Sequence, residues 1–260
     1  MRLQSDIKVT VRNKVIGGPR VLICLPLVAA ETSDLLKVAR ASVSLEPDLL
    51  EWRLDTYQLV TDVPACLDAL AALRDVVGDL PLILTCRRYQ EGGSTRISAD
   101  QRRQLIGAAI QTGDLDLVDI ELSNHDDFIQ TIMDTAKARH VKTILSFHNF
   151  DSTPPKDFLY DRFFQACNMG ADIAKVAVMP SNFKDVLTLM DATLSARENG
   201  LKIPMISISM GDQGRITRAA GSLFGSDITF ANSGTTSAPG QISIQNLRQA
   251  MAALSPAENG

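Results

Sequence analysis

The run that decides the fold is Ala171-Asp172-Ile173-Ala174-Lys175-Val176-Ala177-Val178-Met179-Pro180, which Gly170 precedes. An apolar run of this length without polar alternation is typical of a parallel strand that is buried on both faces. Lys175 lies in the middle of the run, where its ammonium group would lose its hydration, and that loss disfavours the charged form. Two interpretations stay open at this point. Lys175 is either an amine nucleophile that forms an imine with a ketone or aldehyde, or a strand-end lysine whose ammonium reaches solvent.

Runs of the same kind recur along the chain and alternate with amphipathic segments. We expect strands at residues 21–28, 49–54, 81–87, 115–122, 141–147, 171–179, 203–209 and 227–231. We expect helices at residues 31–43, 64–77, 98–112, 124–139, 156–169, 183–197, 216–224 and 242–254. Eight such units in 260 residues predict an α/β protein with a parallel sheet, and favour a (β/α)8 TIM barrel over an open doubly wound sheet. No strand leads into G-x-G-x-x-G or a P-loop, which further disfavours nucleotide-binding open sheets.

The first residues lie outside this rhythm. Residues 7–15 alternate apolar and polar, as a half-buried strand does, and Gly17-Gly18-Pro19 ends the pattern. We therefore expect a single barrel domain over residues 1–260, with an N-terminal β-hairpin cap at residues 1–20 that closes its bottom.

Composition limits the partners of the chain. The net charge of −4 argues against general nucleic-acid binding, and no apolar run approaches the ~20 residues of a membrane helix. The N-terminus has no apolar signal-peptide region. The cysteines form no C-x-x-C pair and the histidines form no H-E-x-x-H motif, so we expect free thiols, a cytoplasmic location and no bound metal.

Polar residues gather at the carboxyl ends of the expected strands, where (β/α)8 barrels carry their chemistry. Solvated strand ends alone would not place ionisable groups on so many separate strands, so we expect one site at this end of the barrel. The candidates are Glu51, Arg53, Arg87, His148, Asn149, Lys175, Ser207, Ser209, Met210, Asn232 and Ser233.

His148 is the candidate acid–base group. It directly follows an apolar run, whereas His125 and His140 lie in or near a polar helix and are expected to be structural. If the fifth and sixth strands are neighbours, about 4.8 Å apart, His148 and Lys175 can reach the same substrate. An imidazole with a pKa near neutrality suits proton transfer beside an imine.

The loop after the third strand supplies a possible partner for His148. Gly92-Gly93 permits a sharp turn that would bring Glu91 back over the mouth, where its carboxylate could orient an imidazole. The alternative is an exposed loop glutamate. A serine hydrolase is disfavoured because no G-x-S-x-G motif is present.

Seven segments, in order, resemble the type I 3-dehydroquinate dehydratases, the Schiff-base dehydratases of the shikimate pathway. They are Glu51-Trp52-Arg53-Leu54-Asp55, the loop at residues 87–93, Ser146-Phe147-His148-Asn149-Phe150, Ala174-Lys175-Val176-Ala177, Ser209-Met210-Gly211, residues 215–218, and Ser237-Ala238-Pro239-Gly240-Gln241. The resemblance extends over nearly the whole chain. It implies a (β/α)8 barrel that forms a homodimer, takes a small-molecule substrate and needs no cofactor.

The resemblance also implies roles for ten residues. Lys175 would form the imine, His148 would act as general acid–base, and Glu91 would position the imidazole. The implied substrate-binding residues are Glu51, Arg53 and Arg87 at the ring hydroxyls, Met210, Arg218 at the carboxylate, and Ser237 and Gln241 on a lid loop at residues 231–241. Some members carry a substrate-contacting serine near the end of the first strand. This chain has Cys24-Leu25-Pro26-Leu27 there, so any contact from Pro26 stays open.

The activity that the resemblance implies is dehydration of 3-dehydroquinate to 3-dehydroshikimate. A class I aldolase, which also uses a Schiff-base lysine, is the alternative enzyme. A barrel that binds a small molecule without turning it over is the alternative from another class.

Overall fold

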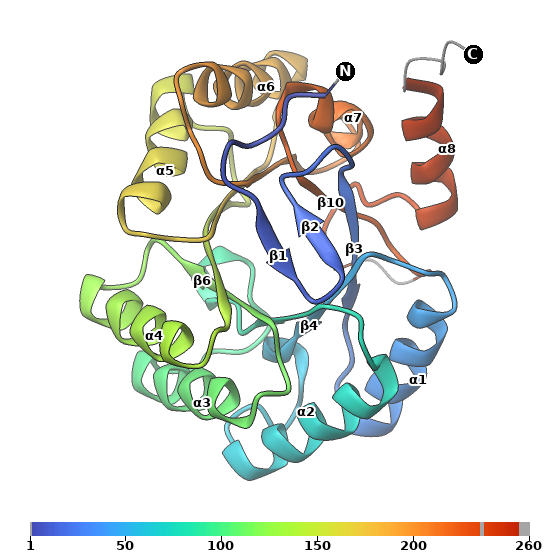
Figure 1. The fold of residues 1–260 in the computed structure, drawn as a ribbon, viewed down its shortest axis with the longest axis vertical. Coiled ribbons are helices and arrows are strands. Elements are labelled where there is room, and N and C mark those ends of the chain that lie inside the picture. The colour runs from blue at the N-terminus through green and yellow to red at the C-terminus, as the bar shows by residue number, and fades with distance from the viewer. Residues whose placement is uncertain (1, 235–236, 255–260) are drawn as a thin grey trace.

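The computed structural model describes residues 2–234 and 237–254 of the chain. Among these residues, eight parallel strands form one sheet in the order β10-β3-β4-β5-β6-β7-β8-β9, with the helices in a ring around it (Figure 1). The strands are β3 (Leu22–Leu27), β4 (Leu49–Arg53), β5 (Leu82–Thr85), β6 (Leu117–Glu121), β7 (Lys142–Asn149), β8 (Ile173–Val178), β9 (Met205–Ser209) and β10 (Ile228–Phe230). The helices are α1 (Thr32–Val43), α2 (Val63–Val77), α3 (Ala99–Thr112), α4 (Asp126–Ala138), α5 (Lys156–Asn168), α6 (Phe183–Glu198), α7 (Arg215–Ala220) and α8 (Ile244–Leu254).

The two end strands of this sheet meet and close the barrel. The backbone N–H of Asp227, just before β10, donates to the carbonyl of Met205 at the start of β9 over 2.7 Å. The N–H of Ser207 donates to the hydroxyl of Ser226 over 3.1 Å. The (β/α)8 barrel predicted from the strand–helix rhythm is therefore confirmed, and the open doubly wound sheet is excluded.

Local sequence signals explain where several helices begin and end. Ser98 caps α3 through a capping box with Gln101, and Gly113 ends the helix in the left-handed conformation. The side chain of Asp62 accepts from the N–H of Ala65 at the start of α2. The expected helix at residues 216–224 is instead the shorter α7 followed by a 3₁₀ turn, η3 (Gly221–Phe224), and Gly221, a weak helix former, marks the change.

The predicted hairpin is present and covers one end of the barrel. β1 (Val9–Val11) and β2 (Lys14–Ile16) pair antiparallel, with Val9 opposite Ile16. Their buried side chains Val9, Val11 and Ile16 form one apolar cluster with inward-facing residues from the start of the barrel strands, such as Leu49 and Ile83. Figure 1 shows β1 and β2 across the centre of the ring. The hairpin is thus the floor of the barrel interior.

Side chains inside the barrel change from apolar to polar along the strands. Successive residues of a strand point to opposite faces, so positions two apart both face the interior. Ile83, Leu117 and Ile144 belong to the interior apolar cluster. Two residues further along the same strands stand Thr85, Asp119 and Ser146, all completely buried. The floor is therefore hydrophobic, while the carboxyl end of the barrel holds buried polar groups.

Two further expectations concern the cysteines and the membrane. All four cysteines carry free thiols, as predicted. Within the described residues, no helix is long and apolar enough to cross a bilayer.

The hairpin floor leads to a stability prediction. Ile16→Ala removes a fully buried side chain from the contact between hairpin and barrel. The substitution should lower the free energy of unfolding by about 2–5 kcal/mol, measured by urea denaturation. Val15→Ala is the matched control, because Val15 is 40% exposed in the same strand, and its effect should stay within about 0.5 kcal/mol. Equal effects of the two substitutions would contradict the assignment of the hairpin as the floor.

Candidate active site

One cavity opens at the carboxyl end of the strands, where charged, polar and apolar side chains converge, as they do in small-molecule sites. All ten residues to which the resemblance implies a role line it. The described lining residues are Glu51, Arg53, Arg87, Glu91, His148, Phe150, Lys175, Ala177, Ile208, Met210, Arg218, Phe230, Ser237, Ala238 and Gln241. Pro26 is not among them.

Lys175 lies at the bottom of this cavity, on β8, and only 4% of it is exposed. Its Nζ donates to Asp119 Oδ2 over 2.8 Å and lies 3.6 Å from Glu51 Oε1. The Nζ also lies 4.7 Å from the centre of the Phe230 ring. The interpretation in which the ammonium reaches solvent is therefore wrong. The amine nevertheless has polar neighbours, because two carboxylates flank it.

Asp119 is the main residue that sequence reasoning missed. Burial alone would raise the pKa of its carboxyl, but Arg87 and Lys175 together hold that pKa well below its usual range. The signal was present in the sequence. Asp119 and Glu121 stand two apart in an expected strand, and strand alternation directs both side chains to the same face.

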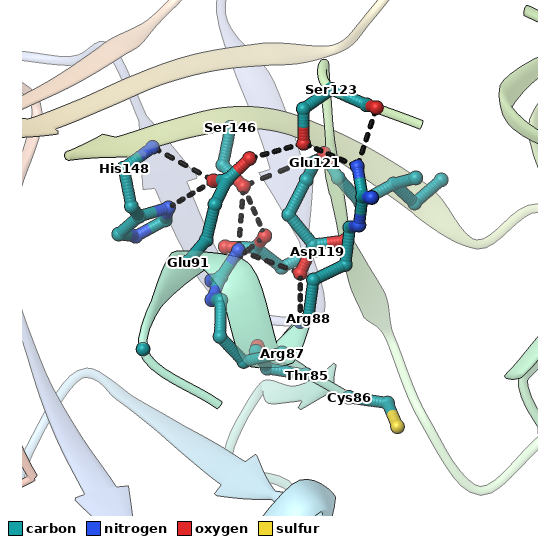
Figure 2. A network of polar contacts seen from close by, with 12 residues as sticks. Thr85, Cys86, Arg87, Arg88, Glu91, Asp119, Glu121, Ser123, Ser146 and His148 are labelled. Atoms are coloured by element: carbon teal, nitrogen blue, oxygen red, sulfur yellow. Dashed lines mark hydrogen bonds and ion pairs between the residues drawn. The ribbon is translucent and has the colours of Figure 1, made fainter. Parts of the chain in front are cut away.

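Asp119 joins Lys175 to Arg87 and to a buried network that reaches Arg102 of α3. Figure 2 shows Arg87 beside Asp119 and Glu121. The Arg87 guanidinium lies 3.0 Å from Asp119 Oδ1 and 3.0 Å from Glu121 Oε1. It also donates to the hydroxyl of Ser146 over 2.8 Å. The other oxygen of Glu121 lies 2.5 Å from Arg102 of α3. Every oxygen of the two acids thus has a cationic partner, which is what burial of charged groups requires.

His148 and Glu91 form the second functional pair. β7 runs to Asn149, two residues beyond its expected end, so His148 belongs to the strand and pairs with Ala177 of β8. Glu91 Oε2 accepts from the backbone N–H of His148 over 2.8 Å and lies 3.4 Å from the imidazole Nδ1. Within the described residues Nδ1 has no hydrogen-bond partner, so this second contact is an ion-pair distance and not a hydrogen bond.

The surroundings shift both members of this pair. Burial, followed by the nearby cations Arg87 and Lys175, lowers the pKa of His148 well below its usual value. Burial also raises the pKa of Glu91. The imidazole is therefore neutral at neutral pH and free to accept a proton, and Glu91 lies where it can stabilise the imidazolium that results.

The turn that places Glu91 depends on glycine, as predicted. Gly92 has φ of 82°, and a Cβ there would lie 2.4 Å from the Phe150 ring. A Cβ on Gly93 would lie 2.2 Å from the carbonyl oxygen of Arg87. A larger residue at either position does not fit. The two glycines thus permit the tight 3₁₀ turn η2 (Tyr89–Glu91), and this turn directs Glu91 inward and buries it.

Two further arginines line the cavity, and within the described residues only one of them has an acidic partner. Arg53 makes two 2.9 Å hydrogen bonds to the carboxylate of Asp55. Arg218 is only 2% exposed, and its hydrogen bonds go to the carbonyls of Phe230 and Pro239. Burial lowers the pKa of Arg218 to about 10, and no acidic side chain counters this. Arg218 is thus a buried cation that lacks an anionic partner within the described residues.

The loop expected to act as a lid is described except for residues 235 and 236, which lie outside the described residues. Its Ser237 N–H donates to Gln241 Oε1 over 2.8 Å, and Gln241 Nε2 donates to the Ser237 hydroxyl over 3.0 Å. The N–H of Gly211, after β9, donates to the carbonyl of Pro239. The end of the loop therefore lies against Met210 and Gly211 at the cavity mouth.

Some expected mouth residues lie elsewhere. Ser207 faces α6, where its hydroxyl contacts that of Thr193 over 2.6 Å. Its neighbours Ile206 and Ile208 point into the barrel, so strand alternation turns Ser207 outward. Asn149, Ser209, Asn232 and Ser233 are likewise not among the described lining residues. The exposed His125 and His140 lie outside the cavity.

The family model of type I 3-dehydroquinase matches residues 23–257. The chain belongs to the type I 3-dehydroquinase family. Two relatives with the name 3-dehydroquinate dehydratase support this. The one from Albidiferax ferrireducens is 41% identical over 92% of this chain and 91% of its own length, and one from Klebsiella pneumoniae is 40% identical over 95% and 98%.

Solved structures place the chain in the same family. The 3-dehydroquinate dehydratase of Geobacillus kaustophilus superposes with a TM-score of 0.96 at 40% identity and covers 100% of both chains. The type I 3-dehydroquinate dehydratase of Clostridium difficile, solved with covalently modified comenic acid, gives a TM-score of 0.93 at 37% identity, covering 96% of this chain and 98% of its own.

The contrast between two buried arginines of this chain gives a stability prediction. Arg102→Met should lower the free energy of unfolding by about 3–5 kcal/mol, because it leaves one oxygen of the buried Glu121 carboxylate without its cation. Arg218→Met should change it by no more than about 1 kcal/mol, because a cation without an acidic partner is replaced by an apolar side chain of similar length. Urea denaturation measures both values. A large loss for Arg218→Met would show that Arg218 serves the fold.

Proposed function

We propose that the chain is a hydro-lyase of the shikimate pathway that converts 3-dehydroquinate to 3-dehydroshikimate and water through an imine on Lys175. The observation that carries the proposal is the buried Lys175 amine, held between two carboxylates in a cavity that also contains a neutral imidazole and an unpaired guanidinium. These are the groups that imine formation, proton transfer and binding of an anionic substrate need. Family membership supports the same substrate, since the matching relatives are named 3-dehydroquinate dehydratase.

Arg218 orients the substrate in this account. A carboxylate is the ligand that best complements a buried guanidinium without an acidic partner, because it supplies both the charge and the paired oxygens. Glu51, Arg53 and Arg87 line the same cavity and serve as the hydroxyl-binding groups, and Met210, Ser237 and Gln241 complete the wall. The ring ketone then lies over Lys175.

Lys175 must lose a proton before it attacks. Glu51 Oε1 lies 3.6 Å from its Nζ, within reach to take that proton through one water, while Asp119, whose pKa is held well below its usual range, stays ionised beside it. The free amine adds to the ketone carbon. The proton taken from the ammonium then returns to the carbinolamine oxygen, which leaves as water and gives an iminium ion. The iminium withdraws electrons and acidifies the neighbouring carbon.

His148 then moves the proton of the elimination. Its neutral imidazole removes a proton from the carbon beside the iminium, and an enamine forms. The enamine electrons expel the β-hydroxyl, which takes a proton from the His148 imidazolium and leaves as water. Hydrolysis of the remaining imine releases 3-dehydroshikimate and regenerates the Lys175 amine.

The loop at residues 231–241 serves as a lid in this proposal. It follows β10 and carries Ser237 and Gln241, whose side chains bond to each other at the cavity wall. Closure over bound substrate would replace that mutual contact with contacts to substrate and exclude bulk water, which otherwise hydrolyses the iminium before elimination. We propose in addition that the enzyme is a cytoplasmic homodimer, as the resemblance implies.

Chemical trapping tests the imine. Sodium borohydride added during turnover of 3-dehydroquinate should reduce the imine to a stable secondary amine, and mass spectrometry of the digested protein should find the adduct on Lys175. Lys142→Ala, which removes a half-exposed lysine of the neighbouring strand β7, should leave the adduct in place. Lys175→Ala should abolish it. An adduct on a different lysine would refute the assignment of the nucleophile.

Removal of the acid–base group separates the two stages of the reaction. His148→Ala keeps the amine and should still be trapped by borohydride, whereas kcat should fall by at least the ~10²–10⁴-fold that general acid–base groups contribute. Steady-state rates and trapping yields measured on the same protein give both values. Near-normal kcat in this variant would exclude His148 from the proton transfers.

A further inference from the structure

Glu91 is held from two sides, and only one of them is His148. Its Oε2 accepts from the backbone N–H of His148 and faces the imidazole. Its Oε1 accepts a hydrogen bond from the hydroxyl of Ser123 (Figure 2). That hydroxyl in turn accepts from Arg88 Nη1 over 2.7 Å, and Arg88 Nη1 also donates to the carbonyl of Ser123. Arg88, Ser123, Glu91 and His148 therefore form one continuous chain of contacts.

The chain of contacts crosses three neighbouring strands outside the substrate cavity. Arg88 follows β5, Ser123 follows β6, and His148 lies in β7. Neither Arg88 nor Ser123 is among the described residues that line the substrate cavity. Both line a separate cavity, which shares Glu91, His148 and Phe150 with the first. Ser123 and Arg88 therefore reach the acid–base pair without touching the space for substrate.

We infer that Ser123 and Arg88 are positioning residues that keep the Glu91 carboxylate ionised and directed at the His148 imidazole. The inference rests on the proposed function, since it assigns to His148 the proton transfers of the dehydration.

The direction of the hydrogen bonds explains the effect. A serine hydroxyl has one proton, and a guanidinium that donates to its oxygen leaves that proton free to point at Glu91. The Glu91 carboxylate thus receives donors on both oxygens, from Ser123 and from the His148 backbone. Hydrogen bonds to the charged form of a carboxyl favour ionisation. They oppose the burial that raises the pKa of Glu91.

Other charged groups around the pair come from several elements. Arg87, after β5, lowers the pKa of Glu91, and Glu121 of β6 raises it. His148 faces the cations Arg87, Lys175 and Arg53 and the carboxylate of Asp119. Because these groups interact, Glu91 and His148 titrate as a pair, and the acid limb of the kcat–pH profile reports that pair.

Loss of the Ser123 hydroxyl should move this limb in a defined direction. Ser123→Ala removes a donor to ionised Glu91, so the pKa of Glu91 rises further and more enzyme carries a protonated, uncharged Glu91 at a given pH. The acid limb of kcat should shift to higher pH by about one unit, the size expected for one charge-assisted hydrogen bond. The Michaelis constant at the pH optimum should change less than about twofold, because Ser123 lies outside the substrate cavity.

Further variants test whether the shift comes from the hydrogen-bonded contact itself or from a general change in side-chain size or charge. Ser123→Thr keeps the hydroxyl and should restore the original limb. Arg88→Met should shift the limb in the same direction as Ser123→Ala, and the double variant should shift less than the sum of the two single shifts, because both act on one contact. Arg103→Met is the matched control. Arg103 is an arginine of α3 that pairs with Asp127, so its substitution removes an equal charge without touching Ser123 or Glu91.

The experiment measures how the turnover number and the Michaelis constant for dehydration of 3-dehydroquinate depend on pH, in the parent protein and in these variants. An upward shift in Ser123→Ala that Thr restores and Arg103→Met lacks supports the inference. An unshifted limb in Ser123→Ala, no rescue by Thr, or an equal shift in Arg103→Met overturns it. An inactive parent protein would instead refute the proposed function, so the two failures are distinguishable.

Discussion

Asp119 holds two cations at once, and the geometry of the site depends on that shared contact. One of its oxygens lies 2.8 Å from Lys175 Nζ and the other 3.0 Å from Arg87. A buried cation is costly without such a partner, so the carboxylate of β6 makes it possible for the barrel to hold an amine on β8 and a guanidinium after β5 in its interior. The contacts with Asp119 therefore fix the positions of the Lys175 and Arg87 side chains, and the cavity lies above them.

Within the described residues, the buried acids beside Lys175 have cationic partners, whereas one buried cation of the cavity wall has no acidic partner. Asp119 and Glu121 are satisfied by Lys175, Arg87 and Arg102. Arg218 is a buried guanidinium whose hydrogen bonds within the described residues go to the carbonyls of Phe230 and Pro239. An anionic ligand therefore brings a charge that the fold itself does not supply. The proton transfers need no further charged group. The neutral His148 imidazole takes the proton from carbon, and that proton leaves with the departing hydroxyl as water.

The barrel and most of the cavity wall could be predicted from the sequence, because both follow from the order of apolar and polar residues within short segments of the chain. Strand–helix rhythm indicates the order of the elements, and the ends of the strands indicate the place of the polar residues. Asp119 was missed, since its importance lies in contacts with residues from two other strands. The expectation for Ser207 is wrong, because alternation along β9 turns its side chain away from the barrel interior and toward Thr193. Ser123 carries no signal in the sequence, because only the folded loops bring it to Glu91.

The most direct test of the account is turnover of 3-dehydroquinate followed by the absorbance of the conjugated enone product. The parent protein should form the enone, and Lys175→Met, which keeps the bulk of the side chain but lacks the amine, should lose many orders of magnitude in kcat while the substrate still binds through Arg218. Retained turnover in Lys175→Met would contradict an imine mechanism. Retro-aldol products without enone, or binding without turnover in the parent, would contradict the dehydratase function itself.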